Sequence, residues 1–232
     1  MSRPHFSNTH LNQRLPGLGR RSSQAGLTPA DLEAAFGRYV AEALRLRGVY
    51  GGRIALALGF ESELIHDGTL AEIDALWARY PALDYMVGSV HHVGGTPIDF
   101  SRELFERAVA EHGGHQALFA AYYDAQYALL QHARPAVVGH FDLIKMYCPE
   151  VPYGDDVRRR IARNIQAIAA YGGLVELNSR AFKKGLPTPY PQPDVLQVRC
   201  QERRGRRAEA APSNLMEGGT PRCADRIGFC RQ

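Results

Sequence analysis

The chain has 232 residues, of which 45% are hydrophobic and 22% charged, a composition that suits one folded domain or two small ones. The net charge is +4, but residues 1–26 and 197–232 each carry +4 while residues 27–196 carry −4. Because the positive charge is confined to the two ends of the chain, the main support for nucleic-acid binding is removed. No run of eighteen apolar residues and no N-terminal apolar segment is present, so we expect a cytoplasmic protein without a membrane span or secretory signal.

The start of the central region predicts a capped amphipathic helix. Thr28 suits the N-cap position, Pro29 the first helical position and Asp31 the first turn. The apolar residues that follow recur at helical spacing: Leu32, Phe36, Tyr39, Ala43 and Leu46.

Short apolar runs and helical patterns then alternate along the chain. Strands are predicted at residues 53–61, 83–92, 135–142 and 173–178. Helices are predicted at residues 69–80, at 101–132 with a break near Gly113 and Gly114, and at 155–171. Strands that alternate with helices of ten residues or more indicate parallel βα units, so the fold class is α/β, either an open doubly wound sheet or a barrel.

The two ends of the chain lack this pattern. Residues 1–26 and the stretch after about Pro193 show no sustained period, and the tail is rich in Arg, Gly, Ala and Pro. We therefore expect an irregular N-terminal segment at 1–26, one domain at 27–196 and a disordered or aberrant tail at 197–232. Three of the four cysteines lie in that tail without any CxxC pair, so neither a disulfide framework nor a cysteine zinc site is indicated.

The predicted strands are apolar until their final residues, where polar side chains appear. Glu61 ends the first strand, His91 lies at the end of the second, His140 near the end of the third and Asn178 at the end of the fourth. In both candidate architectures function gathers at the carboxyl ends of the strands. If the strands are neighbours, Glu61, His91 and His140 face one common cavity.

A carboxylate with two imidazoles suits zinc, iron or manganese, and a carboxylate can bridge two metal ions. Bridged metals are well matched to phosphate-ester hydrolysis, because they activate water and neutralise charge on the phosphoryl oxygens. Each residue alone has a plainer reading, since a strand-end histidine is usually structural and a strand-end glutamate is usually solvated. Because a potential metal ligand recurs at three successive strand ends, a metal site becomes a serious alternative to these separate readings. His92 should point to the face opposite His91, as a structural residue.

Several stretches resemble one known family. They are GFESELI from Gly59, LDYMVGSVHHVGGTPIDF from Leu83, RPAVVGHFDLIKM from Arg134 and RNIQAIAAYGGLVELNSRAFKKGLPTPYP from Arg163. Together with LTPADLEAAF from Leu27, they resemble the histidinol-phosphatases of the PHP (polymerase and histidinol phosphatase) superfamily, in the form found in fungi. The resemblance covers residues 27–196.

The resemblance implies a distorted seven-stranded βα barrel with up to three divalent metal ions at its carboxyl edge. Such enzymes hydrolyse L-histidinol phosphate to L-histidinol and phosphate, a late step of histidine biosynthesis. The small phosphate ester would be the partner, with no nucleic acid and no membrane. By motif, Glu61 would bridge two metals, and His91 and His140 would complete the ligands of the second.

Three further residues lie where the resemblance makes phosphate or substrate contacts plausible: Arg163, Asn178 and Lys184. Cationic groups favour a phosphate dianion. Arg163 on a helix and Lys184 in a loop are equally compatible with solvated surface charges.

The chain also departs from the family pattern at both ends. Family members begin with a strand bearing an H-x-H motif and end with an S-D-x-H-like motif, whereas His5 and His10 have a different spacing and no histidine follows His140. We therefore expect an incomplete barrel whose termini are altered relative to a functional enzyme. The alternatives to a histidinol-phosphatase are a catalytically inactive remnant or binding module, and a PHP phosphoesterase for another substrate.

Overall fold

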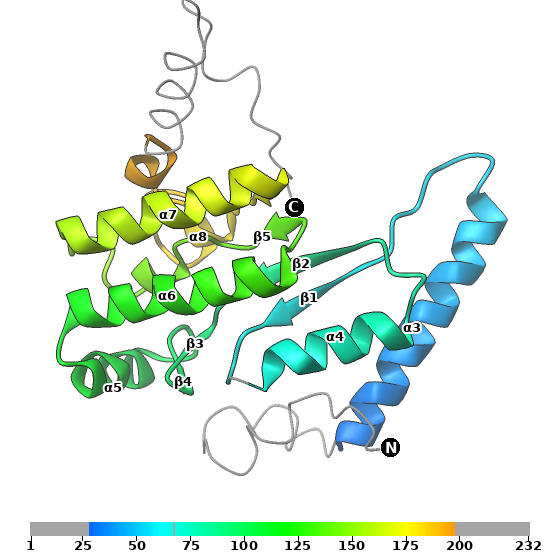
Figure 1. Ribbon diagram of the computed structural model, residues 1–232, viewed down its shortest axis with the longest axis horizontal. Coiled ribbons are helices and arrows are strands. Elements are labelled where there is room, and N and C mark those ends of the chain that lie inside the picture. The colour runs from blue at the N-terminus through cyan, green and yellow to red at the C-terminus, as the bar shows by residue number, and fades with distance from the viewer. Residues whose placement is uncertain (1–27, 67, 198–232) are drawn as a thin grey trace, which may run out of the picture.

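The computed structural model describes residues 28–66 and 68–197 (Figure 1). The expectations for residues 1–26 and for the tail after residue 197 fall outside these ranges. The first described helix, α3 (Pro29–Tyr50), begins with the predicted cap: the hydroxyl oxygen of Thr28 accepts the backbone N–H of Asp31, and the Asp31 carboxylate accepts the backbone N–H of Thr28. Two of the orphan N–H groups at the start of the helix are thereby satisfied.

Four parallel strands form the central sheet in the order β1 (Gly59–Glu63), β2 (Tyr85–Ser89), β5 (Val137–Val138) and β6 (Leu174–Val175). Glu61 pairs with Val87, Val87 with Val137, and Val137 with Leu174. A separate antiparallel pair, β3 (His92–Val93) and β4 (Thr96–Pro97), follows β2 directly.

The strand order confirms the α/β class and helps to distinguish a doubly wound sheet from a barrel. Helix α4 (Thr69–Arg79) joins β1 to β2, α5 (Arg102–His112) and α6 (His115–Ala133) lie between β2 and β5, and α7 (Asp155–Tyr171) joins β5 to β6. Each strand therefore lies beside the next parallel strand in the chain, without the order reversal of a doubly wound sheet. This order is consistent with part of a barrel, and the described residues form an open sheet of four parallel strands.

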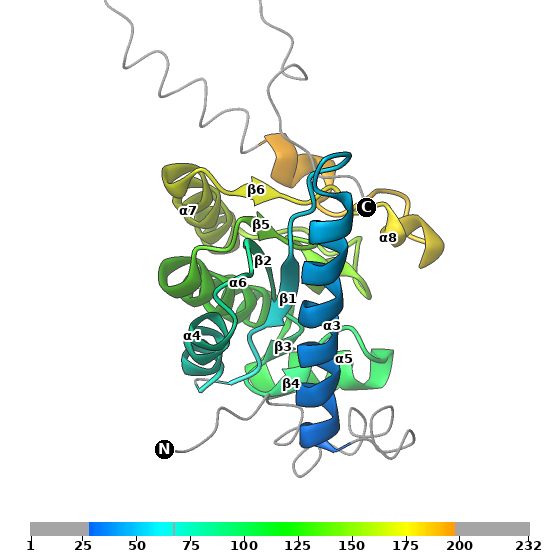
Figure 2. The same cartoon turned by 90° about the vertical axis from the view of Figure 1, so that its right-hand side faces the viewer.

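Helices α4, α6 and α7 lie side by side along one face of the sheet (Figure 2). The main core fills the space beneath them, and its largest side chains are fully buried: Phe105, Phe119, Tyr122, Tyr123 and Phe141. Strand β2 packs closely against its neighbours at Gly88, where an added Cβ would lie 2.7 Å from Pro135 and 3.2 Å from Leu129 of α6. The predicted break between α5 and α6 is also present, with Gly113 at φ 80° and Gly114 at φ 127°, conformations that glycine adopts readily.

The first strand begins later than its apolar pattern predicts. Residues 54–58 are irregular, and side chains supply two of their hydrogen-bond partners: Asp84 accepts the backbone N–H of Leu58 at 2.7 Å, and Arg47 donates to the carbonyl of Leu56 at 2.9 Å. The ladder with β2 starts only at Gly59, so Glu61 occupies the middle of β1 rather than its end.

The third and fourth strands are shorter than predicted, two residues each. After β5 the chain turns near His140, whereas after β6 the backbone N–H of Glu176 still donates to the carbonyl of Val138 at 2.9 Å. The turn after β5 leads into η1 (Leu143–Lys145), and the segment after β6 contains α8 (Arg180–Lys183). Among the described residues, no helix is both long and apolar enough to cross a membrane.

Candidate metal centre

Side-chain alternation places the acidic residues of β1 on the face of the sheet that the three helices leave free. Phe60 contacts Trp77 of α4, with ring centroids 5.4 Å apart. Because successive side chains in a strand point to opposite faces, Glu61 and Glu63 both point away from α4. Ser89 of β2 lies on the same face, since its hydroxyl donates to Glu61 Oε1 at 2.6 Å.

Three sequence-predicted residues converge on this free face: Glu61, His91 and His140 each offer one ligand atom, and these atoms lie within 4.8 Å of one another. The Nε2 atoms of His91 and His140 are 3.0 Å apart, and His140 Nε2 is 3.5 Å from Glu61 Oε1. Both histidines are largely buried, whereas half of the Glu61 side chain is exposed. The group is therefore open to solvent on the carboxylate side.

A second carboxylate, that of Glu63, contacts the ring of His91 on the side away from His140. Glu63 Oε1 lies 3.0 Å from His91 Nδ1, the ring nitrogen remote from His140. Glu63 is the last residue of β1 and is paired in register with Ser89, two residues before His91. His92, by contrast, lies in β3, is buried, and is not part of the converging group.

His140 is held by its backbone as well as by its ring. Its N–H donates to Glu176 Oε2 at 2.8 Å, and Glu176 Oε1 accepts the side-chain amide of Asn178 at 3.1 Å. The φ of His140 is 20°, which is rare for a residue with a side chain. The Glu176 hydrogen bond supports this conformation and links Asn178 to the centre.

The electrostatics of the group favour an ionised carboxylate. A hydrogen bond with His140 is the largest influence that lowers the pKa of Glu61 to about 2, and the Ser89 hydroxyl acts in the same direction against the effect of burial. Burial opposes the charged form of His91, yet the neighbouring Glu63 carboxylate raises the pKa of His91 above its ordinary value. The two nearby carboxylates thus make this face attractive to a cation.

The donor set and its spacing fit a divalent metal ion. Two imidazole nitrogens bound at about 2.0–2.1 Å to a tetrahedral zinc lie roughly 3.3 Å apart, close to the observed 3.0 Å between His91 and His140. Two imidazoles with one carboxylate also form a known catalytic ligand set that leaves a position for water or substrate. The structure therefore contains a candidate metal-binding group at the position that the sequence predicts.

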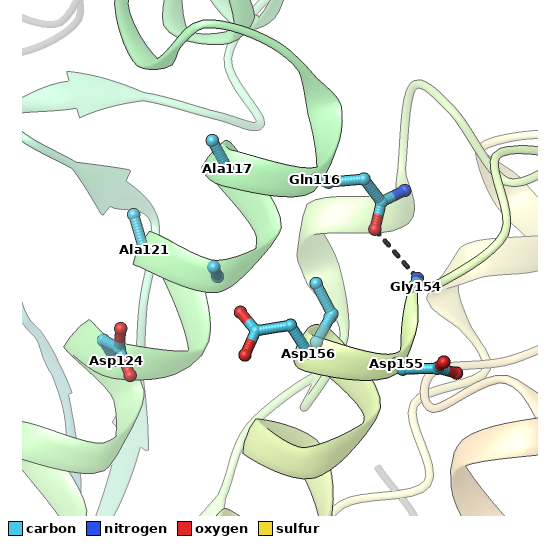
Figure 3. Close-up of a pocket in the computed structure, with 9 residues that line it drawn as sticks. Gln116, Ala117, Ala121, Asp124, Gly154, Asp155 and Asp156 are labelled. Carbon is cyan, nitrogen blue, oxygen red and sulfur yellow. Dashed lines mark hydrogen bonds between the residues drawn. The ribbon is translucent and has the colours of Figure 1, made fainter.

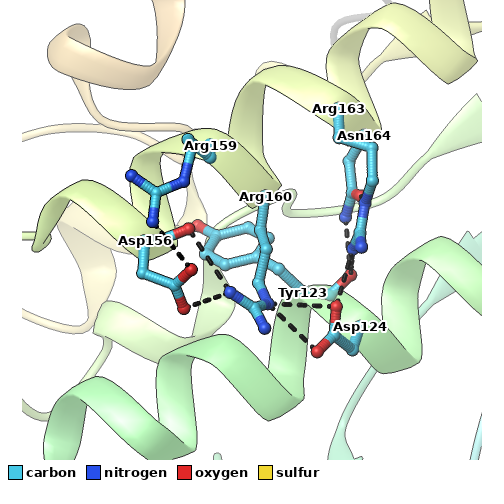
Figure 4. A network of polar contacts seen from close by, with 7 residues as sticks. All are labelled: Tyr123, Asp124, Asp156, Arg159, Arg160, Arg163 and Asn164. Atoms are coloured by element: carbon cyan, nitrogen blue, oxygen red, sulfur yellow. Dashed lines mark hydrogen bonds and ion pairs between the residues drawn. The ribbon is translucent and has the colours of Figure 1, made fainter.

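Arg163 lies elsewhere, in an interface between α6 and α7 (Figure 4). Its guanidinium donates to the carbonyl of Tyr123 at 3.2 Å, to Asp124 at 2.8 Å and to Asn164 at 3.1 Å. It also lies over the ring of Tyr127, 4.0 Å from the centroid. These contacts occupy its hydrogen-bonding groups on the helical side of the sheet, so the structure does not bring Arg163 to the group of three.

Lys184 directly follows α8, on the chain segment after β6. Its ammonium donates to Met146 Sδ at 2.9 Å, in the segment that follows β5. A thioether is a weak acceptor, so this contact ties up little of the lysine's hydrogen-bonding capacity. Lys184 therefore lies among the segments that follow the carboxyl ends of β5 and β6, as does Asn178.

A surface groove of about 630 Å³ opens between α6 and the start of α7 (Figure 3). It is lined by Gln116, Ala117, Ala120, Ala121, Asp124, Gly154, Asp155, Asp156 and Val157. Three of these residues are aspartates, and two of the aspartates are paired with Arg160. A phosphate dianion gains nothing from such a lining, and none of the groove residues belongs to the converging group.

Three supporting residues were not among the predicted site residues: Glu63, Ser89 and Glu176. A signal for Glu63 existed, because it lies two residues after Glu61 and so on the same face of a strand. The same spacing exists for Ser89, two residues before His91, and for Glu176, two residues before Asn178. Their particular contacts, with Glu61 and with His140, depend on how the strands are paired and could not be predicted.

The chain matches known proteins over most of its length. A model of the PHP domain matches residues 21–180. The chain is 41% identical over 182 residues to a protein of Schizosaccharomyces pombe named a probable histidinol-phosphatase, covering 76% of this chain and 59% of that protein. It is 34% identical over 134 residues to the histidinol-phosphatase of Saccharomyces cerevisiae, covering 47% of this chain and 40% of that protein.

A solved structure shares the fold. It is the crystal structure of a provisionally named histidinol phosphatase from Listeria monocytogenes, similar with a TM-score of 0.68 at 18% identity, over 84% of this chain and 76% of that one. The two fungal relatives, by contrast, are matched over 59% and 40% of their length, so this chain corresponds to a part of each.

Proposed function

The chain belongs to the PHP domain family, and from this premise we propose that it is a divalent-metal-dependent phosphomonoesterase that hydrolyses L-histidinol phosphate to L-histidinol and phosphate. This reaction belongs to histidine biosynthesis, which we assign to the cytoplasm. The observation that carries the proposal is the convergence of Glu61, His91 and His140 within 4.8 Å in a chain 41% identical to a protein named a probable histidinol-phosphatase.

Glu61, His91 and His140 would hold the metal, and their donor types suit zinc, iron or manganese. When bound, the metal would polarise the phosphoryl group and lower the pKa of water. Within the described residues this is the one set of three such ligands. The partly exposed Glu61 carboxylate, which the Ser89 hydroxyl orients, would face the incoming substrate.

Two of the predicted substrate contacts remain in the proposal. Lys184 would bring a positive charge to the phosphate dianion, a charge-assisted contact that is stronger than a neutral hydrogen bond. Asn178 would hold its amide toward the site because Glu176, which also accepts the N–H of His140, fixes it. Arg163 is left out, since its contacts are with α6.

The test is phosphate release from L-histidinol phosphate by the purified protein loaded with zinc or manganese. We expect release that a chelator abolishes and added metal restores. His140→Ala should lower the rate by at least about 100-fold, comparable to the loss of a catalytic stabilising group. His132→Ala is the matched control, because His132 pairs with Asp74 on the surface at 2.9 Å, between α6 and α4.

Two other outcomes would contradict the proposal in different ways. Release of phosphate from p-nitrophenyl phosphate but not from L-histidinol phosphate would indicate a phosphoesterase for another substrate. Folded, metal-loaded protein that releases phosphate from neither compound would be an inactive member of the family.

A further inference from the structure

We propose that Glu63 is a positioning residue that presets His91 for metal binding, whereas His140 has to change tautomer when the metal binds. This inference rests on the proposed metal site and goes beyond it, because it assigns unequal roles to the two histidines and a role to a carboxylate outside the ligand set.

The geometry at His91 fixes the position of its hydrogen. A carboxylate accepts hydrogen bonds and donates none when ionised. With Glu63 Oε1 at 3.0 Å, the ring hydrogen of neutral His91 belongs on Nδ1. The lone pair is then on Nε2, which points at the other two ligand atoms. A carboxylate that holds the remote nitrogen of a ligand histidine is a recurring feature of metal sites.

The same hydrogen bonds put His140 in the opposite tautomer. Since Nε2 of His91 is an acceptor, the contact of 3.0 Å between the two Nε2 atoms requires the hydrogen of neutral His140 to be on Nε2. Glu61 Oε1, at 3.5 Å from the same nitrogen, also favours a hydrogen there. His140 Nδ1 is buried and has no hydrogen-bond partner among the described residues.

Metal binding therefore changes the two histidines differently. His91 already presents a lone pair. His140 Nε2 must release its hydrogen as a proton to water, and Nδ1 takes up a proton in its place, so the ring stays neutral. This rearrangement makes His91 the first point of attachment, and His91 depends on Glu63.

The direct test is the tautomer of each ring, read from long-range proton–nitrogen NMR spectra of nitrogen-15-labelled protein. In the metal-free protein, at an alkaline pH where both rings are neutral, we expect the hydrogen of His91 on Nδ1 and that of His140 on Nε2. After zinc is added, we expect His91 to be unchanged and the hydrogen of His140 to be on Nδ1. A metal-free protein in which His91 carries its hydrogen on Nε2 would overturn the proposal.

A second test measures metal affinity, by titration with Mn²⁺ and detection of the free ion by electron paramagnetic resonance. Glu63→Ala should weaken binding by roughly 10–100-fold, the range seen when a ligand's supporting partner is lost. Glu63→Gln should weaken it less, because the amide oxygen can accept the same hydrogen. Glu42→Ala on α3 is the matched control, since that glutamate is exposed and pairs only with the nearby Arg45 in the described contacts.

The results separate this proposal from the proposed function. Glu63→Ala that binds Mn²⁺ as the wild-type protein does would overturn the role of Glu63 while leaving the metal site intact. Wild-type protein that binds no metal would overturn the proposed function and the tautomer change at His140. The tautomer of His91 in the metal-free protein would still decide whether Glu63 presets His91. If Glu63→Ala fails to fold, Glu63→Gln and the wild-type spectra decide the question.

Discussion

Each of the three proposed ligands contacts a side chain that belongs to a neighbouring strand or to the segment that follows that strand. Ser89 orients Glu61, Glu63 holds His91, and Glu176 holds the backbone of His140. Such support matters because a ligand set must be arranged before the metal arrives if binding is to be tight. At the scale of single residues, the proposed site therefore comprises three candidate ligands and three carboxyl or hydroxyl groups that contact them.

The lowered pKa of Glu61 predicts a pH-dependent contribution to stability in the metal-free protein. A carboxylate whose pKa falls to about 2 on folding, from about 4.3 in a free chain, stabilises the folded state at pH values above the unfolded pKa. That stability is lost as the pH falls through the folded pKa. Glu61→Gln should therefore be less stable than the wild-type protein at pH 6, and the difference should shrink as the pH falls from about 4.3 toward 2.

Urea denaturation at a series of pH values measures this effect. His132→Ala, whose surface pair with Asp74 is remote from the site, controls for general changes in net charge. A difference between Glu61→Gln and wild type that stays constant down to pH 2 would show that the Glu61 carboxylate is not stabilised by its neighbours.

At the scale of elements, the contact between α6 and α7 explains why Arg163 is better understood as part of the helical layer. Asn164, fully buried beside it, donates to the carbonyl of Tyr123 at 2.8 Å and to Gln126 at 3.1 Å. Arg163 continues this network toward the surface (Figure 4). The network fixes the position of α7, which leads directly into β6 and so to Glu176.

Arg163→Ala should therefore reduce stability without affecting catalysis directly. We expect a loss of about 1–2 kcal/mol, because several hydrogen bonds and a contact with Tyr127 disappear together. The matched control is Arg159→Ala on the same helix: Arg159 is 71% exposed and pairs with Asp156 on the surface, so its loss should stay within about 0.5 kcal/mol. Thermal denaturation and steady-state kinetics measure both. A raised KM with unchanged stability would instead support a role for Arg163 in binding substrate.

The approach of β5 to β2 offers a second test at this scale. A Cβ added at Gly139 would lie 2.6 Å from Ser89 Oγ and 3.2 Å from Val87. Gly139→Ala should therefore cost about 1–3 kcal/mol of unfolding free energy. Part of that cost should disappear in a Ser89→Ala background, because the hydroxyl oxygen is the atom in closest conflict.

Urea denaturation of the two single variants and the double variant measures this coupling. Gly52→Ala is the control, since a Cβ there meets nothing within 4 Å. Strictly additive losses at Gly139 and Ser89 would show that the two residues do not compete for the same space.

At the scale of the whole molecule, the sequence allows prediction of the α/β class and of the convergence of Glu61, His91 and His140, but not of the contacts around these three side chains. The capping residues of α3 and the alternation of apolar runs with helices are local signals, and the structure confirms them. The start of β1 was missed because Asp84, 26 residues away, supplies the hydrogen bond to Leu58 that a strand partner would have made. The short β5 was missed because the chain turns at His140, whose unusual φ is supported by the distant Glu176.

The convergence of Glu61, His91 and His140 could be predicted because parallel strands place their carboxyl ends at one edge whatever the details of register. The roles of Ser89 and Glu63 could not, because they depend on which residues of β1 and β2 are paired. The placement of Arg163 was equally beyond the sequence, since helix periodicity alone does not say which neighbouring helix a charged residue contacts.

The most direct test of the central claim, that these three side chains share one metal ion, is anomalous diffraction at the zinc absorption edge from crystals grown with zinc. We expect a peak within bonding distance of His91 Nε2, His140 Nε2 and a carboxylate oxygen of Glu61. A protein that crystallises with this fold, but shows no zinc peak between these three side chains, would contradict it.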